Sequence, residues 1–258
     1  MNIIINKKIN LIQEVRLVHA LCESDFNIII DKSQEEKLIH LKKFNISYKI
    51  NNNHKGINFN DLVKINHSVP ETNIGNIKKP IIFPKAITTH LKENWIDNKT
   101  IDYSFTGLLT LKRKNVLEEW IRKNQNLNYS IDTDKEYSIN IGNLYLSSSK
   151  NGRSFPKKSW DTEYYDILLK SKFVICPSGD FIWSYRFFEA ILCGAIPIIE
   201  ENCEAYNGFK FYYMDDTIKD LNYSKDIIKH NYQLCIDRIT INKNILNGEL
   251  QKLHNNSL

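Results

Sequence analysis

The sequence predicts an α/β fold built around a parallel sheet. Three observations support this fold class: strand and helix patterns alternate along the chain, 42% of the residues are hydrophobic, and Gly and Pro occur only 9 and 6 times. The apolar content excludes a disordered chain, and the scarcity of Gly and Pro excludes a collagen-like one. A chain of 258 residues can also bury a core without disulfides or metals.

Residues 1–95 alternate between short strands and helices. The pattern predicts a helix over 12–23, a β-branched strand over 26–31, an amphipathic helix over 33–44 and a strand over 46–50. Ser33 followed by Glu36 makes a Ser-x-x-Glu capping box that opens the second helix. Residues 51–60 and 70–80 are rich in turn formers, so we expect long loops there.

The alternation becomes regular after residue 100. It predicts strands over 101–107, 172–179 and 195–201, and helices over 115–126, 162–171 and 183–194. Strand–helix–strand order of this kind builds a parallel sheet with right-handed crossovers. One further helix is predicted over 224–239, and the polar tail behind it is expected to fray.

Cysteine usage and hydropathy favour a cytoplasmic compartment. The apolar run before Lys8 is too short for a signal peptide, and the longest apolar run, 190–199, is well below the ~20 residues of a membrane helix. The five cysteines are an odd number without a Cys-x-x-Cys pair or zinc-finger spacing: Cys22, Cys176, Cys193, Cys203 and Cys235. We therefore expect reduced thiols and a cytoplasmic protein without a membrane span.

The charge balance is mildly positive, since 35 Lys and Arg against 30 Asp and Glu leave +5. The positive residues are interleaved with acids, as over residues 112–125. Interleaving of this kind is typical of a solvated helix face, so we expect no nucleic-acid partner.

One segment carries the candidate chemistry. The buried strand from Phe173 to Cys176 ends in Pro177, Ser178 and Gly179, where ligands bind in open α/β sheets. The next helix starts near Trp183 or Ser184 and stops at Gly194, a residue free to adopt a positive φ. Its first turn offers N–H groups, the Ser184 hydroxyl and Arg186, a combination suited to a phosphate or diphosphate.

Glu189 lies one turn further along the same helix among apolar neighbours. The i, i+3 spacing places it over Arg186 on the one polar stripe. Two interpretations are open: an Arg186–Glu189 pair that only shields the helix edge, or a carboxylate that accepts both ribose hydroxyls of a bound nucleotide.

A family resemblance covers about residues 100–205. Its strongest part is Ser171-Lys172-Phe173, Cys176-Pro177-Ser178-Gly179, Ser184-Tyr185-Arg186, Glu189-Ala190 and Gly194-Ala195-Ile196-Pro197. Tyr164 and Leu168-Leu169 precede that part, and Ser104-Phe105-Thr106-Gly107 with Arg113 lies further upstream. These blocks resemble the nucleotide-sugar-binding half of exostosin-like glycosyltransferases.

The resemblance implies a GT-B fold, in which two Rossmann-like parallel-sheet domains face a cleft. It divides the chain into a reduced acceptor-side domain (1–95), a donor-binding domain (96–215) and a C-terminal helical segment (216–258). The implied donor residues are Arg186 on the diphosphate, Glu189 on the ribose, Ser178, Gly179 and Ser184 at the phosphate turn, Gly107 at a close approach and Arg113 as a second cation. Arg153 is a third cation for donor or acceptor, and Trp183 is a candidate for stacking on a sugar.

The implied activity is a hexosyl or pentosyl transfer from a nucleotide-diphosphate sugar to a glycan or glycoconjugate hydroxyl. Fixed cations and helix N–H groups stabilise the leaving group in this scheme, so we expect neither a metal nor another cofactor. An Asp-x-Asp pair is missing, and Asp215-Asp216 has the wrong spacing for one. Phe181 occupies the place of a glutamate common in retaining relatives, which favours inversion.

Inversion requires a general base, which the resemblance assigns to the first domain. Asp31 is our candidate because it ends a predicted strand, ahead of five alternatives: His19, Glu23, Asp25, Asp61 and His67. Two other functions stay open. A fucosyltransferase-like enzyme using a GDP-sugar shares part of the framework but not its usual Tyr-x-Thr-Glu-Lys signature, and a non-catalytic module could bind sugar nucleotides or glycans without a base.

Overall fold

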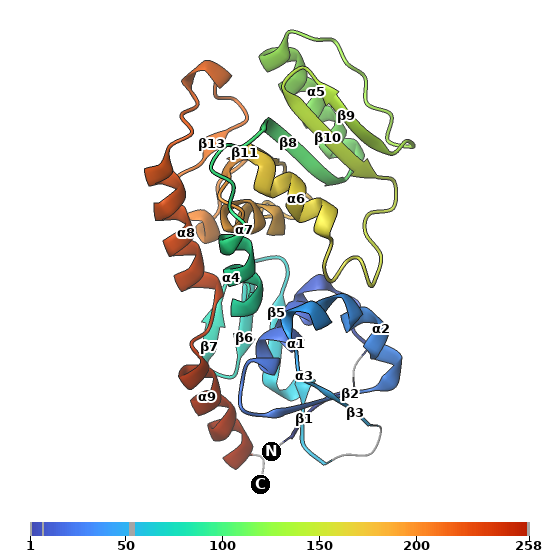
Figure 1. The fold of residues 1–258 in the computed structure, drawn as a ribbon, viewed down its shortest axis with the longest axis vertical. Helices are drawn as coiled ribbons and strands as arrows, with labels where there is room; N and C mark the ends of the chain where they lie inside the picture. Colours follow the sequence, from blue (N-terminus) through green and yellow to red (C-terminus); the bar gives the residue numbers. More distant parts are fainter. Residues whose placement is uncertain (1, 7, 52–54, 257–258) are drawn as a thin grey trace. The chain divides into compact units, whose positions relative to one another are not determined.

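The computed structural model describes residues 2–6, 8–51 and 55–256, and the chain forms two compact units (Figure 1). Unit 1 consists of Met1–Thr89, Ser154–Trp160 and Ile236–Leu258, and unit 2 of His90–Arg153 and Asp161–Cys235. Both units are therefore discontinuous along the chain. The three continuous domains expected from the sequence, 1–95, 96–215 and 216–258, stay a prediction.

Unit 2 is built on a six-stranded sheet in the order β13-β12-β11-β8-β10-β9. All neighbouring strands are parallel except the β9–β10 pair. The strands are β8 (Ile101–Leu108), β9 (Tyr137–Ile141), β10 (Leu144–Ser149), β11 (Ser171–Cys176), β12 (Ile196–Ile199) and β13 (Tyr212–Tyr213). β11 and β12 are almost fully buried, as expected of central parallel strands that helices cover on both faces.

The helices of unit 2 bury apolar faces against this sheet. They are α5 (Leu111–Gln125), α6 (Thr162–Lys170), α7 (Tyr185–Leu192), most of α8 (Lys225–Ile239), and the 3-10 turns η3 (Glu204–Tyr206) and η4 (Ile218–Asp220). Figure 1 shows α5 along β9 and β10, and α6 and α7 beside β11. Trp120 of α5 packs on Tyr103 of β8 in the core, where each fully buried aromatic contributes roughly 2–3 kcal/mol.

Gly194 ends α7 as predicted, with φ 69°. A Cβ at this position would lie 2.9 Å from the Trp95 ring, so only glycine fits both the backbone and the packing. Trp95 donates its indole N–H to the carbonyl of Leu192. Trp95 is therefore a packing residue of unit 2.

Unit 1 contains a four-stranded parallel sheet in the order β3-β2-β1-β4. Its strands are β1 (Asn2–Ile5), β2 (Asn27–Ile30), β3 (Lys49–Ile50) and β4 (Ile57–Asn58). The helical elements are α1 (Ile12–Cys22), η1 (Lys32–Gln34), α2 (Glu35–Leu38), η2 (Ile39–Phe44), α3 (Phe59–Leu62) and the start of α4 (Lys85–Glu93). A separate antiparallel sheet joins β5 (Val63–Asn66), β6 (Glu71–Ile74) and β7 (Ile77–Lys79).

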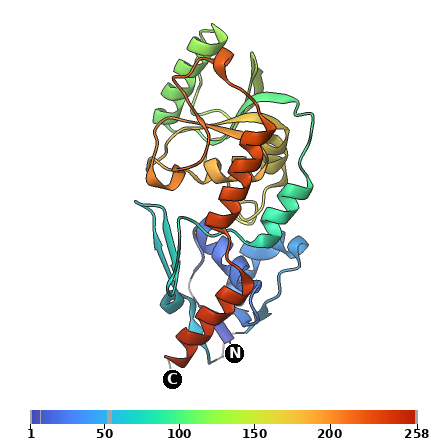
Figure 2. The same cartoon turned by 90° about the vertical axis from the view of Figure 1, so that its left-hand side faces the viewer.

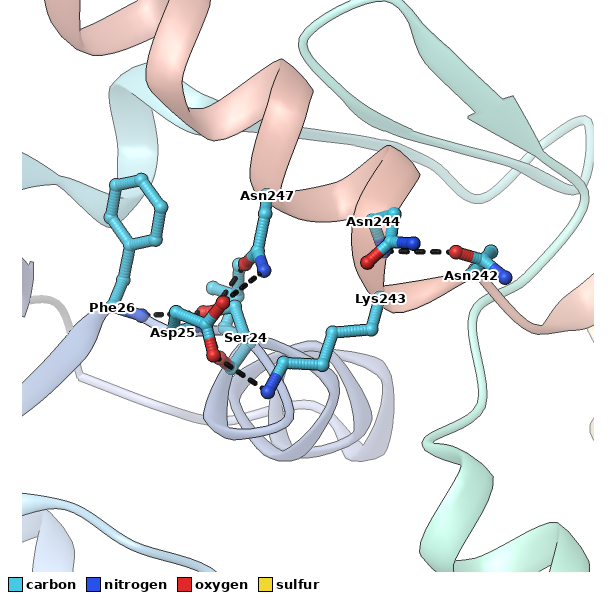
Figure 3. A network of polar contacts seen from close by, with 8 residues as sticks. Ser24, Asp25, Phe26, Asn242, Lys243, Asn244 and Asn247 are labelled. Carbon is cyan, nitrogen blue, oxygen red and sulfur yellow. Dashed lines mark hydrogen bonds and ion pairs between the residues drawn. The ribbon is translucent and has the colours of Figure 1, made fainter.

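The C-terminal tail is a helix, α9 (Lys243–Asn255), so the expectation that it frays is wrong. Figure 2 shows α9 beside the β5–β7 sheet, where Glu249 accepts a hydrogen bond from the Asn76 N–H at 2.7 Å. Figure 3 shows a second attachment: Asp25 forms an ion pair with Lys243 at 2.6 Å and accepts from the Asn247 amide at 2.6 Å. These contacts add to an apolar face, because Leu246, Leu250 and Leu253 recur at helical spacing in α9.

Two local predictions in unit 1 are also wrong. The helix expected over 33–44 is split into η1, α2 and η2, and its cap is Asp31, which accepts from the Ser33 N–H at 2.7 Å. The long loop expected over 70–80 contains β6 and β7, whose tight turn uses Gly75 at φ 54°. Part of the loop expected over 51–60 lies outside the described residues.

The predicted α/β class is confirmed: each unit contains a parallel sheet, and the sheet of unit 1 is the smaller one. In the part of the chain that the structure describes, no helix is both long and apolar enough to cross a membrane. All five cysteines are free thiols.

Candidate functional site

Arg186 lies at the first turn of α7, close to the carboxyl end of β8. Its Nε donates to the carbonyl of Thr106 at 2.9 Å, and its guanidinium carbon lies 4.6 Å from the centre of the Phe105 ring. The residue is only 7% exposed. Its Nη1 is buried and finds no hydrogen-bond acceptor among the described residues. A buried donor of this kind costs free energy unless a ligand or water supplies an oxygen.

Gly107 creates the space for that guanidinium. Its φ is 145°, a conformation that L-residues with a Cβ rarely adopt, and an added Cβ would lie 2.3 Å from Arg186 Nη2. Within unit 2, the group that closely approaches the Gly107 backbone is thus the Arg186 side chain. Contact of Gly107 with a donor stays a prediction.

Arg113 supplies a second guanidinium at the same edge of the sheet. Its Nη1 donates to the Leu108 carbonyl at 3.1 Å and its Nε to the Ser178 carbonyl at 3.4 Å. Burial and the nearby charge of Arg186 lower the pKa of Arg113 to about 10. Across the described ranges, neither arginine forms an ion pair with a carboxylate within 4 Å. Two like charges therefore lie close together at the carboxyl ends of β8 and β11, an arrangement that favours binding of an anion.

The loop after β11 is tied to its surroundings through its own polar groups. Ser178 donates its N–H to Glu200 at 3.0 Å and its hydroxyl to the Ile182 carbonyl at 3.3 Å, and Gly179 donates to the Phe181 carbonyl. Ser184 caps α7: its hydroxyl accepts from the Arg186 N–H. These residues fix the loop geometry, and their expected contacts with a phosphate stay a prediction.

Glu189 does not pair with Arg186 across the i, i+3 spacing in the way the sequence suggests. Its Oε2 accepts from the Tyr164 hydroxyl at 2.5 Å and its Oε1 from the Tyr165 hydroxyl at 2.9 Å. The side chain is 3% exposed. The carboxylate therefore belongs to a buried cluster with α6, and its predicted contact with ribose stays untested by this geometry.

Arg153 completes the same cluster. Its guanidinium carbon lies 3.9 Å from the centre of the Tyr164 ring. Burial opposes the charge of Arg153, but the Tyr164 hydroxyl, Glu189, the Tyr165 hydroxyl and Asp161 together raise its pKa. Burial and Glu189 raise the pKa of Tyr164, while Arg153 and Arg186 oppose the rise. Tyr164 is thus surrounded by the charged groups of the site.

Sequence reasoning missed Tyr164 and Tyr165 as site residues. Tyr164 was visible only as part of the family-like block, and two adjacent tyrosines on a helix are ordinary core residues. Trp183 is buried beside the loop, with its ring 5.0 Å from that of Tyr185, so no sugar-stacking face is evident for it. Gly107, Arg113 and Arg186 lie together in unit 2, and Arg153 and Glu189 both contact Tyr164 of the same unit; the roles predicted for these residues stay predictions.

The candidate base Asp31 lies in unit 1, at the carboxyl end of β2. Both the N–H and the hydroxyl of Ser33 donate to its Oδ1, and these bonds lower its pKa. Glu23 accepts from the N–H groups of Lys85 and Ala86 at the start of α4, and Asp25 joins the α9 network. His19 is 1% exposed, and burial together with Arg16 lowers its pKa to about 3. Asp61 accepts from the Asn58 amide, and His67 directly follows β5.

Within the described residues, no group of three or more His, Cys, Asp or Glu side chains is arranged to hold a metal ion. Metal independence itself stays a prediction.

One protein-family model matches part of the chain. Residues 142–213, from just before β10 to the end of β13, match the family model described as the RXYLT1 C-terminal domain, named for a ribitol xylosyltransferase. The chain thus contains a glycosyltransferase-related segment, which includes Arg153, Arg186 and Glu189 but not Gly107 or Arg113. No curated protein matches the chain.

Among solved structures, the chain is similar to one titled "Crystal structure of GtfA/B complex", with a TM-score of 0.37 and 10% sequence identity. The similarity covers 88% of this chain and 45% of that one, so the chain spans less than half the length of that structure.

Proposed function

We propose that the protein is a glycosyltransferase that uses a nucleotide-diphosphate sugar as donor and a glycan or glycoconjugate hydroxyl as acceptor. The observation that carries this proposal is the pair of guanidinium groups of Arg113 and Arg186, with the Nη1 of Arg186 buried and lacking an acceptor among the described residues. A diphosphate supplies the oxygens and the negative charge that this pair needs. The family match over residues 142–213 and the exostosin-like blocks agree with this donor class.

The chemistry would proceed as a single displacement. The acceptor oxygen forms a bond to the anomeric carbon while the bond from that carbon to the diphosphate oxygen breaks, and the leaving group takes the electron pair. Arg186 and Arg113 stabilise the charge that develops on the leaving oxygen, in a site where burial strengthens the interaction. The acceptor proton passes to a general base, for which Asp31 stays our candidate by its position after β2.

Several finer assignments belong to the same proposal. The reaction inverts the anomeric carbon, requires no metal or other cofactor, and takes place in the cytoplasm. The family name favours a pentosyl over a hexosyl donor. Ser178, Gly179 and Ser184 hold the loop on which the diphosphate rests.

A ligand screen tests the proposal directly. UDP, GDP, CMP and dTDP are added to the full chain in a thermal-shift assay, since a ligand that binds only the native state raises the melting temperature. We expect at least one diphosphate to raise it, and expect Arg186→Ala to abolish the shift. Arg122→Ala is the matched control, because Arg122 is an exposed arginine on α5 of the same unit.

Donor turnover separates an enzyme from a binding module. UDP- and GDP-sugars are incubated with the protein, and release of free nucleotide is followed over hours. Slow hydrolysis that Arg186→Ala removes is the expected result. Binding without hydrolysis or transfer would leave a non-catalytic sugar-nucleotide module, and the absence of any diphosphate binding would refute the donor site itself.

A further inference from the structure

We propose that Glu189 balances charge and positions side chains in the diphosphate site, and does not contact the ligand. The inference rests on the proposed function, because it concerns the same site. A ribose contact would make Glu189 strengthen nucleotide binding. In the role proposed here, Glu189 instead weakens the binding of diphosphates.

The hydrogen bonds of Glu189 support this role. Each carboxylate oxygen already accepts a tyrosine hydroxyl, from Tyr164 at 2.5 Å and from Tyr165 at 2.9 Å. A side chain that is 3% exposed offers a ribose no open approach to these oxygens. The short bond to Tyr164 is typical of a hydroxyl that donates to a charged carboxylate. Both carboxylate oxygens of Glu189 therefore already have hydrogen-bond donors within the protein.

The surrounding charges explain why a carboxylate is needed there. Arg153 stacks on Tyr164, 3.9 Å from its ring centre, and its charge is stabilised by Glu189 and by Asp161 at the start of α6. Burial raises the pKa of the Cys176 thiol to about 12, and the charges of Arg186, Glu189 and Arg113 also act on it. The exposed Asp180 also acts on Arg113. Without Glu189, Arg153 would keep Asp161 as the one carboxylate that favours its charge.

This electrostatic arrangement has a consequence for turnover. A nucleotide-diphosphate sugar carries two negative charges, and the free nucleoside diphosphate gains about one more when the sugar leaves. A site with three poorly balanced cations would bind that product most tightly. By offsetting Arg153, Glu189 holds down the affinity for the more highly charged product and allows it to dissociate.

The test measures the binding of inorganic pyrophosphate, UDP and GDP by isothermal titration calorimetry at low ionic strength. Glu189→Gln keeps the shape of the side chain and removes its charge. We expect it to tighten binding of pyrophosphate and of each nucleotide that the wild type binds, by about tenfold, because a unit charge within several ångströms acts through a partly buried medium. The gain should shrink as salt is added.

Two further variants make the readout specific to charge. Combining Glu189→Gln with Arg153→Gln restores the charge of the cluster, and the affinities should return to within about threefold of the wild type, as in a double-mutant cycle. Glu119→Gln is the matched control: it makes the same charge change on the exposed face of α5, and it should leave all affinities unchanged.

The outcomes separate the two proposals. If Glu189→Gln weakens UDP and GDP and leaves pyrophosphate unchanged, the carboxylate holds the ribose and this inference is overturned, while the donor site stands. If the wild type binds no probe, the proposed function fails and this inference with it. If Glu189→Gln does not fold, Arg153→Gln alone decides: weaker pyrophosphate binding supports the inference, and unchanged binding overturns it.

Discussion

His19 in unit 1 and Arg186 in unit 2 are both buried basic side chains. Each has a nitrogen that lacks a hydrogen-bond partner among the described residues, but the two differ in their charge. His19 in α1 of unit 1 has two such nitrogens, and burial with the nearby Arg16 lowers its pKa to about 3. Its imidazole is therefore neutral at pH 7. Arg186 in unit 2 cannot shed its proton in a protein. The difference teaches that a buried imidazole can lose its proton, whereas a buried guanidinium keeps a positive charge that a bound anion would offset.

The carboxyl ends of the parallel strands show the same contrast. Asp31 follows β2 in unit 1, and its carboxylate accepts hydrogen bonds from the N–H and the hydroxyl of Ser33. Arg186 follows β11 in unit 2 and leaves Nη1 without an acceptor in the described structure. The same topological position thus holds a satisfied cap in one sheet and an unsatisfied donor in the other.

The largest effect is expected from Gly107→Ala, which displaces the guanidinium of Arg186. The added Cβ would lie 2.3 Å from Arg186 Nη2 on a backbone with φ 145°. We expect diphosphate affinity to fall by about 100-fold, since the guanidinium must move, and stability to fall by about 1–3 kcal/mol from backbone strain. Calorimetric titration and urea unfolding measure the two effects.

Gly248→Ala in α9 is the control, because a Cβ there meets nothing within 4 Å. It should leave diphosphate binding unchanged and add roughly 0.5–1 kcal/mol of helix stability. Wild-type affinity in Gly107→Ala would show that the position of Arg186 is unimportant for the anion.

Asp31 offers the next largest effect, in unit 1. Asn caps helices as well as Asp does, so Asp31→Asn should keep the stability of the native state, whereas Asp31→Ala should cost about 1 kcal/mol. If Asp31 is the base, the Asn variant lowers donor hydrolysis by about 100-fold at unchanged donor affinity. A hydrolysis rate equal to that of the wild type would confine Asp31 to capping.

The neutral state of the buried His19 is tested by measuring stability against pH. The pKa of His19 is lowered to about 3 in the folded protein, against 6.5 in the unfolded chain. As the pH falls below 6.5, His19 becomes protonated in the unfolded chain but stays neutral in the native state. The free energy of unfolding therefore declines until about pH 3. His19→Leu removes this contribution.

We expect the loss of stability between pH 7 and pH 4.5 to be about 2 kcal/mol smaller in His19→Leu than in the wild type. Urea titrations at both pH values measure it. Equal losses in the two proteins would mean that His19 finds a proton-accepting partner in the native state.

The smallest effect is expected at the network in Figure 3. Asn247→Ala removes two exposed hydrogen bonds to Asp25 and should cost less than about 1 kcal/mol. Asn242→Ala removes the N-cap of α9, which accepts from the Asn244 N–H at 2.9 Å, and should cost about 1 kcal/mol. A larger loss for Asn247 than for Asn242 would reverse this ranking and make the Asp25 contact the main attachment of α9.

How much was predictable differs between the two units for a physical reason. In unit 2 the helices α5, α6 and α7 and the strands β8 and β11 bury long periodic faces, and a period is visible in one dimension. In unit 1 the strands β6 and β7 are only four and three residues long, and their pairing depends on a turn at Gly75. The polar α9 depends on contacts such as Glu249 to Asn76. The two strands are too short to show a period, whereas α9 does show one in the spacing of Leu246, Leu250 and Leu253.

The site divides in the same way. Arg186, Glu189 and the loop after β11 could be selected from the sequence because they lie within one strand–turn–helix segment. The partners of Glu189 could not, since Tyr164 and Tyr165 are more than twenty positions away and meet it only when α6 packs beside α7.

By itself, the sequence determined which residue types stand at the carboxyl ends of the strands, because the order of strand, turn and helix is local. Only the tertiary structure decided which of these groups are already satisfied. Burial and hydrogen bonding depend on residues distant in the chain: Thr106 holds Arg186 by one bond and leaves another donor open, while two tyrosines engage both oxygens of Glu189.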